Sequence, residues 1–189
     1  MKYYCEKCQK EMETRVQQVN QDFQVKDQKV NSTIRVRICE VCGEEVWDEI
    51  IERENEKSVF SAYRKKVGLL QPEEILEIRK KYKVSQVTFA KILGFGAKTI
   101  TRYENGSIQD FCHDNLIRLV GSNVINFYSL WMRRKVFLTH NENSQIEKLF
   151  YNDFPIGNIK TDYCTESSYF QTIGVEFKEN EEGEIIDAA

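Results

Sequence analysis

Residues 85–106 read SQVTFAKILGFGAKTITRYENG, and this stretch decides the fold of the middle of the chain. Ser85 is suited to cap the start of a helix, because its hydroxyl can accept a hydrogen bond from a backbone N–H of the first turn. Gly94 is suited to end that helix, and a turn containing Gly96 leads into a second helix predicted over residues 97–105. Two short helices joined by a glycine-containing turn are typical of a helix-turn-helix.

The second helix of this pair is predicted to have one apolar and one polar face. Ile100 and Tyr103 recur three residues apart and would pack against the scaffold, while Lys98 and Arg102 would face outward. The Arg102 guanidinium could donate two hydrogen bonds to O6 and N7 of a guanine in the major groove of DNA. Gln86, at the start of the first helix, is placed to meet a phosphate. The predicted DNA contacts are therefore Gln86, Lys98, Thr99, Thr101 and Arg102.

The charge is distributed unevenly along the 189 residues. The whole chain carries 27 Lys and Arg against 30 Asp and Glu, a net charge of −3. Residues 71–109 carry seven basic and four acidic residues, whereas residues 1–58 carry ten basic and thirteen acidic ones and residues 176–189 carry one lysine and six acids. A basic middle between acidic ends predicts that only the middle meets a polyanion such as DNA. The alternative interpretation of the middle is a plain helical bundle with solvated cations.

Two identical cysteine spacings lie near the start of the chain, Cys5-x-x-Cys8 and Cys39-x-x-Cys42, with 30 residues between them. Each tight turn can direct two sulfurs to one side, so a hairpin that joins the turns offers four thiolates to one tetrahedral ion. We therefore predict one structural Zn²⁺ per chain, held by all four cysteines. Surface disulfides are disfavoured in a reducing compartment. A thioredoxin-type redox pair is disfavoured because no βαβ pattern surrounds either motif.

Between the cysteine pairs, apolar residues alternate with polar ones on both sides of a polar stretch at residues 26–32, which is predicted to form a turn. The alternating apolar residues are Phe23, Val25, Ile34, Val36 and Ile38. The segment 1–45 is therefore expected to be a small zinc-ribbon-like β domain.

A helical linker is expected over residues 46–68. Its apolar residues recur at helical spacing on both sides of the charged stretch 52–57, which would be solvated and bridge two units. These apolar residues are Trp47, Ile50, Ile51, Val59, Phe60, Tyr63 and Val67.

Helix signals continue along the rest of the chain. Pro72 is suited to the first position of a helix, and another helix is predicted over residues 110–120. Asn123 is predicted to cap a helix with one apolar face, residues 143–151 to form a further helix, and residues 172–177 a strand. The residues of that apolar face are Ile125, Tyr128 and Trp131. We expect an α+β chain with a helix-turn-helix domain over residues 69–122 and a largely helical C-terminal extension of unassigned role over residues 123–189.

Several classes of protein are disfavoured by what the sequence lacks. The N-terminus has no apolar stretch that could act as a secretory signal, and no run of about 18 apolar residues occurs, so a cytoplasmic location without membrane contact is expected. Cys112, Cys164, His113 and His140 stand alone, without the partners that a nucleophile or a catalytic metal requires. The sequence has no phosphate-binding glycine loop, nucleophile elbow or paired-carboxylate motif and does not predict an enzyme.

The combination of these motifs resembles the MqsA-like (YgiT-type) antitoxins over residues 1–120. Residues 85–106 look like the Xre/Cro-type helix-turn-helix of that family, residues 69–79 are similar to its lead-in, and the two CxxC pairs match its N-terminal zinc domain. The resemblance implies a zinc-binding domain that can hold a toxin and an all-α helix-turn-helix domain that dimerises and represses its own operon. Arg102 matches an arginine that reads bases in the family, whereas Lys98 stands in place of an asparagine, so the operator sequence is expected to differ.

We therefore expect a sequence-specific repressor that binds a palindromic operator as a homodimer, autoregulates its operon and neutralises a cognate toxin. The alternative is a stand-alone phage or mobile-element regulator without a toxin. Strand edges near Phe23–Val25, the charged stretch 52–57 and the acidic tail 179–187 could each contact a toxin, although the tail could also be a solvated terminus. Residues 133–135, Arg-Arg-Lys, could touch a flanking phosphate or form a solvated helix end, and the sequence leaves both open.

Overall fold

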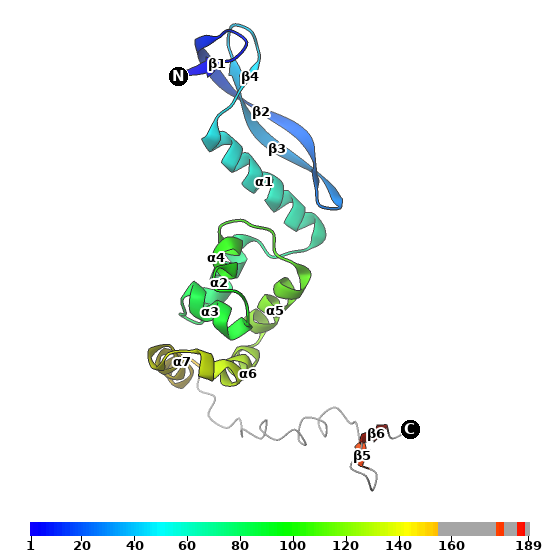
Figure 1. The fold of residues 1–189 in the computed structure, drawn as a ribbon, viewed down its shortest axis with the longest axis vertical. Coiled ribbons are helices and arrows are strands. Elements are labelled where there is room, and N and C mark those ends of the chain that lie inside the picture. The colour runs from blue at the N-terminus through cyan, green and yellow to red at the C-terminus, as the bar shows by residue number, and fades with distance from the viewer. Residues whose placement is uncertain (155–176, 180–184, 188–189) are drawn as a thin grey trace. The chain divides into compact units, whose positions relative to one another are not determined.

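The computed structural model describes residues 1–154, 177–179 and 185–187 of the chain (Figure 1). The chain divides into two compact units, Met1–Leu149 and Phe150–Ala189. The first unit begins with an antiparallel sheet and continues with helices, so the predicted α+β class is confirmed.

In the second unit, two short strands are described. They are β5 (Phe177–Glu179) and β6 (Ile185–Asp187), which pair in antiparallel fashion. Cys164, most of the strand predicted over residues 172–177 and part of the acidic tail lie outside the described residues.

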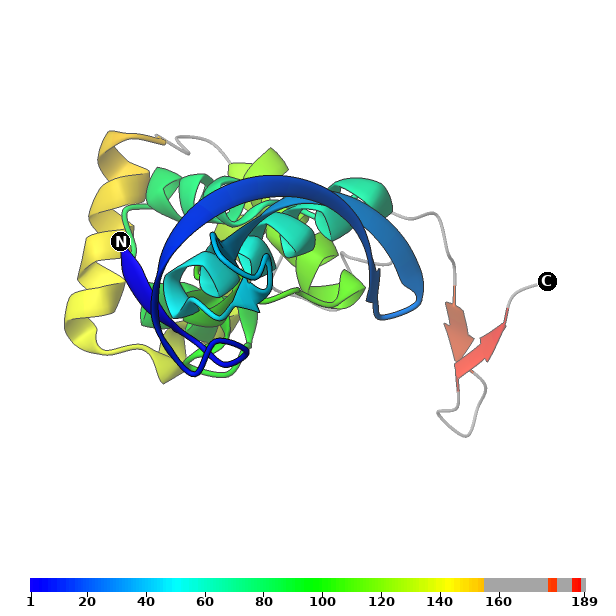
Figure 2. The same ribbon diagram turned by 90° about the horizontal axis from the view of Figure 1, so that it is seen from above.

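The first unit opens with a four-stranded antiparallel sheet in the order β1 (Lys2–Cys5), β2 (Lys10–Val25), β3 (Gln28–Cys39) and β4 (Glu45–Val46). β2 and β3 form a long hairpin, which curves over the following helix in Figure 2. Val25 pairs with Gln28, so only two residues form the turn. The predicted turn over residues 26–32 is therefore too long. Val30 and Ser32 continue the alternation and lie buried on the inner face of β3.

Helix α1 (Glu49–Val67) begins three residues later than predicted, because a strand and a cap come first. Val46 belongs to β4, and the Asp48 carboxylate accepts hydrogen bonds from the N–H groups of Ile50 and Ile51 at 3.0 and 3.2 Å. Trp47 consequently precedes the helix. Both Trp47 and Ile50 are exposed, so their assignment to the apolar face of the helix is wrong.

The rest of α1 packs along β3 and shares a hydrophobic core with the hairpin. The charged stretch 52–57 is solvated, as predicted, except at Asn55, which is buried. The Asn55 amide accepts a hydrogen bond from the backbone N–H of Arg35 at 2.9 Å and donates one to its carbonyl at 2.7 Å, so it binds the edge of β3. The charged stretch 52–57 is therefore held on the sheet through Asn55. The buried core residues are Val25, Val30, Ile34, Val36, Ile38, Val59, Tyr63 and Leu69.

A buried polar network joins the end of α1 to the helices that follow. Arg64 is fully buried, and its guanidinium donates hydrogen bonds to the Gly106 carbonyl and to the Gln109 side chain. The Gln109 amide donates to the Leu70 carbonyl at 2.6 Å and to Asp114 at 3.0 Å, and Asp114 accepts from the Leu70 N–H at 2.8 Å. Burial lowers the pKa of Arg64. A polar group this deep is stabilised only with its partners in place, so the network fixes the connection between α1 and the helices.

The helices after α1 are α2 (Pro72–Lys81), α3 (Gln86–Leu93), α4 (Thr99–Glu104), α5 (Phe111–Ser122), α6 (Val124–Arg134) and α7 (His140–Asn152), with a 3₁₀ turn η1 (Lys135–Phe137) before α7. The predicted caps are confirmed: Ser85 accepts from the Thr88 N–H, Gly94 ends α3 in the left-handed conformation and Asn123 caps α6. α4 is shorter than the predicted 97–105, because Lys98 is its N-cap: the Lys98 carbonyl accepts a hydrogen bond from the Arg102 N–H, but the helix itself begins at Thr99 and ends at Glu104.

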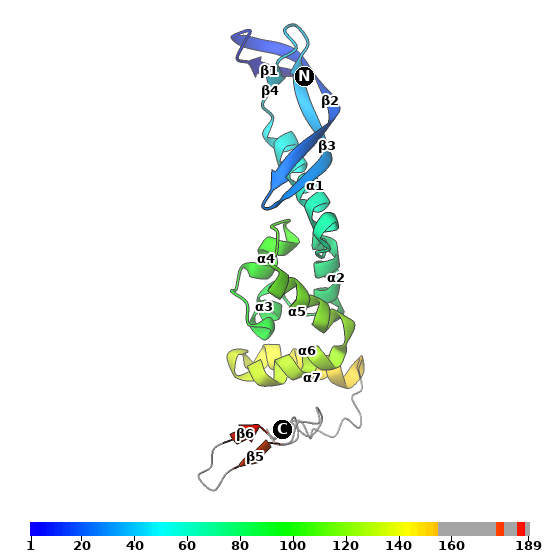
Figure 3. The ribbon, with the colours of Figure 1, turned by 90° about the vertical axis from the view of Figure 1, so that its right-hand side faces the viewer.

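Helix α6 packs into one core with α3 and α5, although the sequence places it in the C-terminal extension. Phe127 is fully buried and stacks on Tyr82 with ring centroids 3.8 Å apart. Figure 3 shows α6 next to α3 and α5. The predicted apolar face was wrong in one member, because Ile125 is exposed and Phe127 lies inward with Trp131.

Helix α7 is anchored to α3 through its first turn. Glu142 accepts hydrogen bonds from the Thr88 hydroxyl at 2.8 Å and from the Lys91 ammonium at 3.0 Å, both on α3. The helix begins at His140, three residues before the predicted start. None of the described helices has both the length and the apolar character needed to cross a lipid bilayer.

Replacing Phe127 with Ala is expected to destabilise the protein by about 3–5 kcal/mol, because the substitution leaves a cavity against Tyr82. Urea unfolding followed by circular dichroism measures the loss. Phe137→Ala is the matched control, since Phe137 is exposed in η1 and its truncation should cost no more than about 0.5 kcal/mol. Equal losses for the two variants would show that α6 is not part of the core.

Candidate metal centre and nucleic-acid interface

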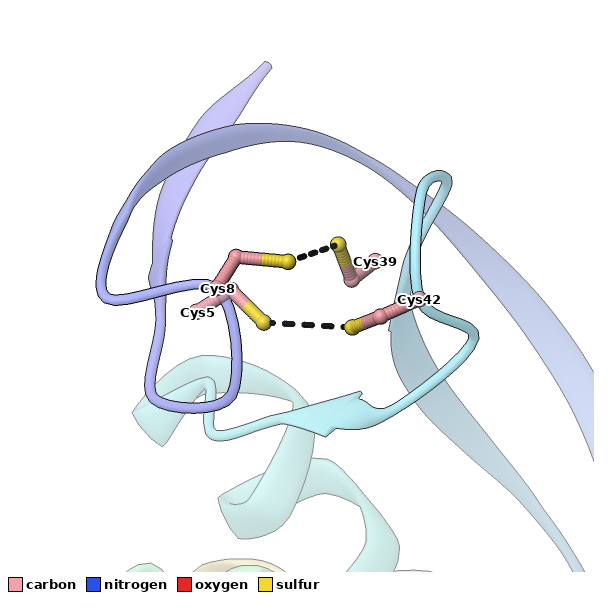
Figure 4. Close-up of side chains that lie close together, drawn as sticks. All are labelled: Cys5, Cys8, Cys39 and Cys42. Atoms are coloured by element: carbon pink, nitrogen blue, oxygen red, sulfur yellow. Dashed lines mark hydrogen bonds between the residues drawn. The ribbon is translucent and has the colours of Figure 1, made fainter.

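The four cysteines predicted as metal ligands lie together at one end of the sheet (Figure 4). Their sulfur atoms are all within 4.8 Å of one another, with Cys5 Sγ 3.4 Å from Cys42 Sγ and Cys8 Sγ 4.0 Å from Cys39 Sγ. A tetrahedral ion with Zn–S bonds of 2.3 Å separates its sulfurs by about 3.8 Å. The observed distances bracket that value, so the four thiols fit a tetrahedral metal ion.

Matching backbone turns position the two cysteine pairs. Cys5 ends β1 and Cys39 ends β3, and each pair is followed by a residue in the left-handed conformation. That residue is Gln9, with φ of 52°, after the first pair and Gly43, with φ of 73°, after the second. The Gly43 N–H donates to the Cys39 carbonyl at 2.9 Å and closes the second turn. Glycine and glutamine thus serve the same turn, although only glycine adopts this conformation without steric cost.

The backbone of the second turn favours a thiolate at Cys39, whereas burial and hydrogen bonds to Cys5 and Cys39 raise the pKa of Cys42. Backbone N–H groups of Cys42 and Val41 direct hydrogen bonds at the Cys39 sulfur and, against the opposing effect of burial, lower the pKa of that thiol to about 7. Thiolates are the form in which cysteines bind a metal ion. Four sulfur ligands complete a tetrahedral shell, so the centre has the composition of a structural rather than a catalytic site.

The second candidate site is the pair α3 and α4. Ile100 is fully buried and Tyr103 is buried, as the predicted apolar face requires, whereas Lys98 and Arg102 are exposed. Thr99, between the two cations, is half-buried. Within the described part of the chain, neither the Lys98 ammonium nor the Arg102 guanidinium forms an ion pair. The two cations are therefore available to an anionic ligand.

The other two predicted contact residues, Gln86 and Thr101, are engaged in a network that joins α2, α3 and α4. Arg79 on α2 binds both carboxylate oxygens of Glu104 on α4, at 2.6 and 2.9 Å. Gln86 donates to the same carboxylate at 2.6 Å, and the Thr101 hydroxyl donates to the Gln86 carbonyl oxygen at 2.8 Å. The side chains of Gln86 and Thr101 thus orient α4 on its neighbours, and the backbone N–H of Gln86, at the start of α3, can still meet an anion.

Sequence reasoning missed Arg79 and Glu104, the centre of this network. The two residues lie 25 positions apart in the sequence. Each looks like an ordinary surface charge, because Arg79 is one of several basic residues near the end of α2 and Glu104 is the last residue of α4. The pairing of one acid with one base among many is not visible in the sequence. Hydrogen bonding to Glu104 raises the pKa of Arg79, which is the behaviour of a closely paired guanidinium.

Among the described residues, the histidines and cysteines outside the cysteine cluster differ in their surroundings, and His113 is the one with packing contacts. His113 Nδ1 is 2.7 Å from the Tyr103 hydroxyl, and its ring lies 3.9 Å from that of Phe95 in the turn between α3 and α4. His113 therefore supports the position of that turn. Cys112 and His140 are exposed.

Cys39→Ser is expected to abolish stoichiometric metal binding, because three remaining thiolates bind the ion far more weakly than four. Metal content by plasma mass spectrometry of the purified chain measures this. Cys112→Ser provides the control, since Cys112 lies outside the cluster and this variant should keep about one ion per chain. Retention of a full metal equivalent by the Cys39 variant would contradict the assignment.

Glu104→Ala is expected to cost about 3–5 kcal/mol of stability, because it leaves the Arg79 guanidinium largely buried without its carboxylate. Chemical denaturation measures the change. Glu77→Ala on α2 is the control, because Glu77 is exposed and its removal should change stability little. A loss below about 1 kcal/mol for the Glu104 variant would show that the network does not hold α4.

One known protein family covers both the cysteine cluster and the α3–α4 pair. The model of one family, described as the antitoxin component of a bacterial toxin–antitoxin system, MqsA, matches residues 1–125. A comparison with curated proteins found no relative of significant similarity. The match spans the cysteine cluster, α1 and the helices as far as the start of α6, which is about two thirds of the chain. The chain therefore belongs to the MqsA antitoxin family.

Proposed function

We propose that this antitoxin represses transcription of its own operon by binding a palindromic DNA site as a homodimer, with α4 in the major groove. The observation that carries the proposal is a pair of exposed cations, Lys98 at the N-cap of α4 and Arg102 on the helix, neither of which has an ionic partner among the described residues. Arg102 would donate two hydrogen bonds to guanine O6 and N7, and Lys98 would contact a base or a phosphate. Thr99 lies between the two cations on the same short helix.

The scaffold behind α4 supports this function. Ile100 and Tyr103 anchor the inner face, and the Arg79–Glu104–Gln86 network fixes the helix against α2 and α3. A recognition helix must be held rigidly to keep its side chains in register with the bases. Two copies related by a two-fold axis would place their α4 helices about 34 Å apart on one face of the DNA, which matches a palindromic operator.

Gln86 and Thr101 have supporting parts in this proposal. The N-terminus of α3 would direct the backbone N–H of Gln86 at a phosphate, while the Gln86 side chain stays bonded to Glu104. Thr101 would hold the Gln86 amide and present its methyl group toward the DNA. The residue set predicted from the sequence is thus kept, with indirect roles for two side chains.

For the cysteine cluster we propose a single Zn²⁺ as the resident ion. Cys5, Cys8, Cys39 and Cys42 would hold it, and the ion would fix the end of the sheet by joining β1 to β3. Four sulfur ligands suit zinc in a structural site and leave no position for a substrate. We assign the centre a role in folding and assign the protein no catalysis, and we place it in the cytoplasm, where thiols stay reduced.

The N-terminal lobe, the sheet with α1, is proposed to bind the cognate toxin, and residues 69–122 together with α6 to form the DNA-binding part. The family description implies a toxin partner. A stand-alone phage or mobile-element regulator remains the alternative function. Tight binding of a protein encoded beside this gene would favour the antitoxin, and its absence would favour the stand-alone regulator.

Arg102→Ala is expected to weaken binding to the operator by about 1–3 kcal/mol while non-specific binding changes little, because the lost contact reads a base. Fluorescence anisotropy with the operator upstream of the gene measures both affinities at one fixed salt concentration. Lys65→Ala is the control, since Lys65 is an exposed cation on α1 and should leave the specific affinity unchanged. Operator affinity equal to wild type in the Arg102 variant would reject α4 as the recognition helix.

A further inference from the structure

An open groove of about 630 Å³ lies in the N-terminal lobe, where β1, β4 and the start of α1 meet. The chain contributes to it from two segments, one before and one after the long hairpin. Its lining residues are Tyr3, Tyr4, Glu6, Glu45, Val46, Trp47, Asp48, Glu49 and Ile50.

Large apolar side chains in this groove face solvent. Trp47 is 72% exposed, Ile50 is 70% exposed and Tyr4 is 60% exposed. Trp47 and Ile50 follow the apolar spacing of α1 in the sequence, yet Trp47 precedes the Asp48 cap and Ile50 is exposed in the first turn of the helix, so both side chains lie outside the core. Exposed aromatic and aliphatic groups gathered at one concave place mark an interaction surface rather than a part of the fold.

The charge of the groove restricts the partner. Four carboxylates line it, and its lining contains no lysine or arginine among the described residues. Asp48 is bonded to Arg37 and Glu49 to Arg53, whereas Glu6 and Glu45 have no ionic partner in the described part of the chain. These two free carboxylates would repel DNA phosphates and attract a cationic group.

Next to the groove, Arg37 binds two of its lining residues, Tyr3 and Asp48, by the contacts that a cationic partner would use. The Arg37 guanidinium lies 3.9 Å from the centre of the Tyr3 ring and pairs with Asp48 at 2.8 Å. Trp47 and Tyr4 offer further aromatic faces next to the free carboxylates of Glu6 and Glu45. A guanidinium or ammonium group stacked on an aromatic ring and paired with a carboxylate gains both contacts at once.

We propose that this aromatic and acidic groove is the surface on which the antitoxin receives its cognate toxin, through an arginine- or lysine-bearing segment of the toxin. The assignment rests on the proposed function of the N-terminal lobe. A second copy of this chain is a less suitable occupant, because its free cations on α4 are those that the DNA requires. The antitoxin would thus use surfaces of opposite charge for its two ligands: the cations of α4 would bind DNA, and the acidic groove would bind the toxin.

The groove carries its own reporter. The chain has two tryptophans, and Trp131 is buried, so Trp131→Phe leaves the exposed Trp47 as the single tryptophan of the chain. Titration of the metal-loaded, full-length Trp131→Phe chain with the purified protein encoded beside its gene should shift Trp47 emission to the blue as the indole leaves water. The same titration yields the dissociation constant, which calorimetry with the wild-type chain should reproduce.

Two kinds of variant test the chemistry, with affinity measured by calorimetry. Trp47→Ala should weaken the complex at least about tenfold through lost aromatic contact. The double variant Glu6→Gln, Glu45→Gln should weaken it by about tenfold at low salt and flatten its dependence on salt concentration, since it keeps shape and removes charge. Val16→Ala on the edge of β2 and Glu56→Gln on the solvated face of α1 are the controls, and both should bind within about twofold of wild type. Metal content and circular dichroism confirm that every variant is folded.

The outcomes separate the groove from the proposed function. If wild type binds the toxin and the Trp47 and double glutamine variants bind equally well, the groove assignment is overturned and the toxin-binding function stands. Loss of toxin binding in Val16→Ala alone would place the toxin-binding surface at the edge of β2 and would also overturn the groove assignment. Dissociation of the antitoxin dimer by Trp47→Ala, seen by light scattering, would identify a second copy as the occupant. No binding by wild type would reject both the toxin-neutralising function and the groove.

Discussion

The buried pair of Arg79 and Glu104 is the interaction on which the proposed DNA-binding face depends. The carboxylate at the end of α4 receives two hydrogen bonds from α2 and one from Gln86 on α3, so a single acidic group ties three helices together. Removing one member would leave a desolvated charge, which makes the arrangement all-or-none. Because the inner side of α4 is fixed in this way, its outer side can present Lys98 and Arg102 in a defined direction.

A second set of polar contacts mounts the N-terminal lobe on this scaffold. Asn55 binds the edge of β3, and nine residues later on the same helix Arg64 binds the Gly106 carbonyl in the segment that follows α4. One helix therefore contacts both the sheet that carries the cysteines and the loop that follows α4. In an antitoxin such an element offers a physical route by which occupation of one lobe could bias the other. The cysteine cluster lies at one end of the sheet, Asn55 holds α1 on β3, and Arg64 holds α1 on the helices that follow.

The sequence predicts those features that depend on local chemistry. The cysteine spacing, the caps at Ser85 and Asn123 and the outward position of Arg102 each follow from a few neighbouring residues, and the structure agrees with them. Trp47 was misplaced because helical spacing does not show where an N-cap such as Asp48 starts a helix. The bonding of Gln86 to Glu104 was not visible either, because a pairing between distant residues depends on the tertiary fold.

The central claim is that the Arg102 guanidinium reads guanine N7 in the major groove. Substituting 7-deazaguanine for each operator guanine in turn, and measuring the affinity of wild type and Arg102→Ala for every probe, tests this contact directly. The account predicts one position in each half-site at which the modified base weakens wild-type binding about tenfold or more and leaves the variant unaffected. An equal loss for both proteins at every position would contradict it.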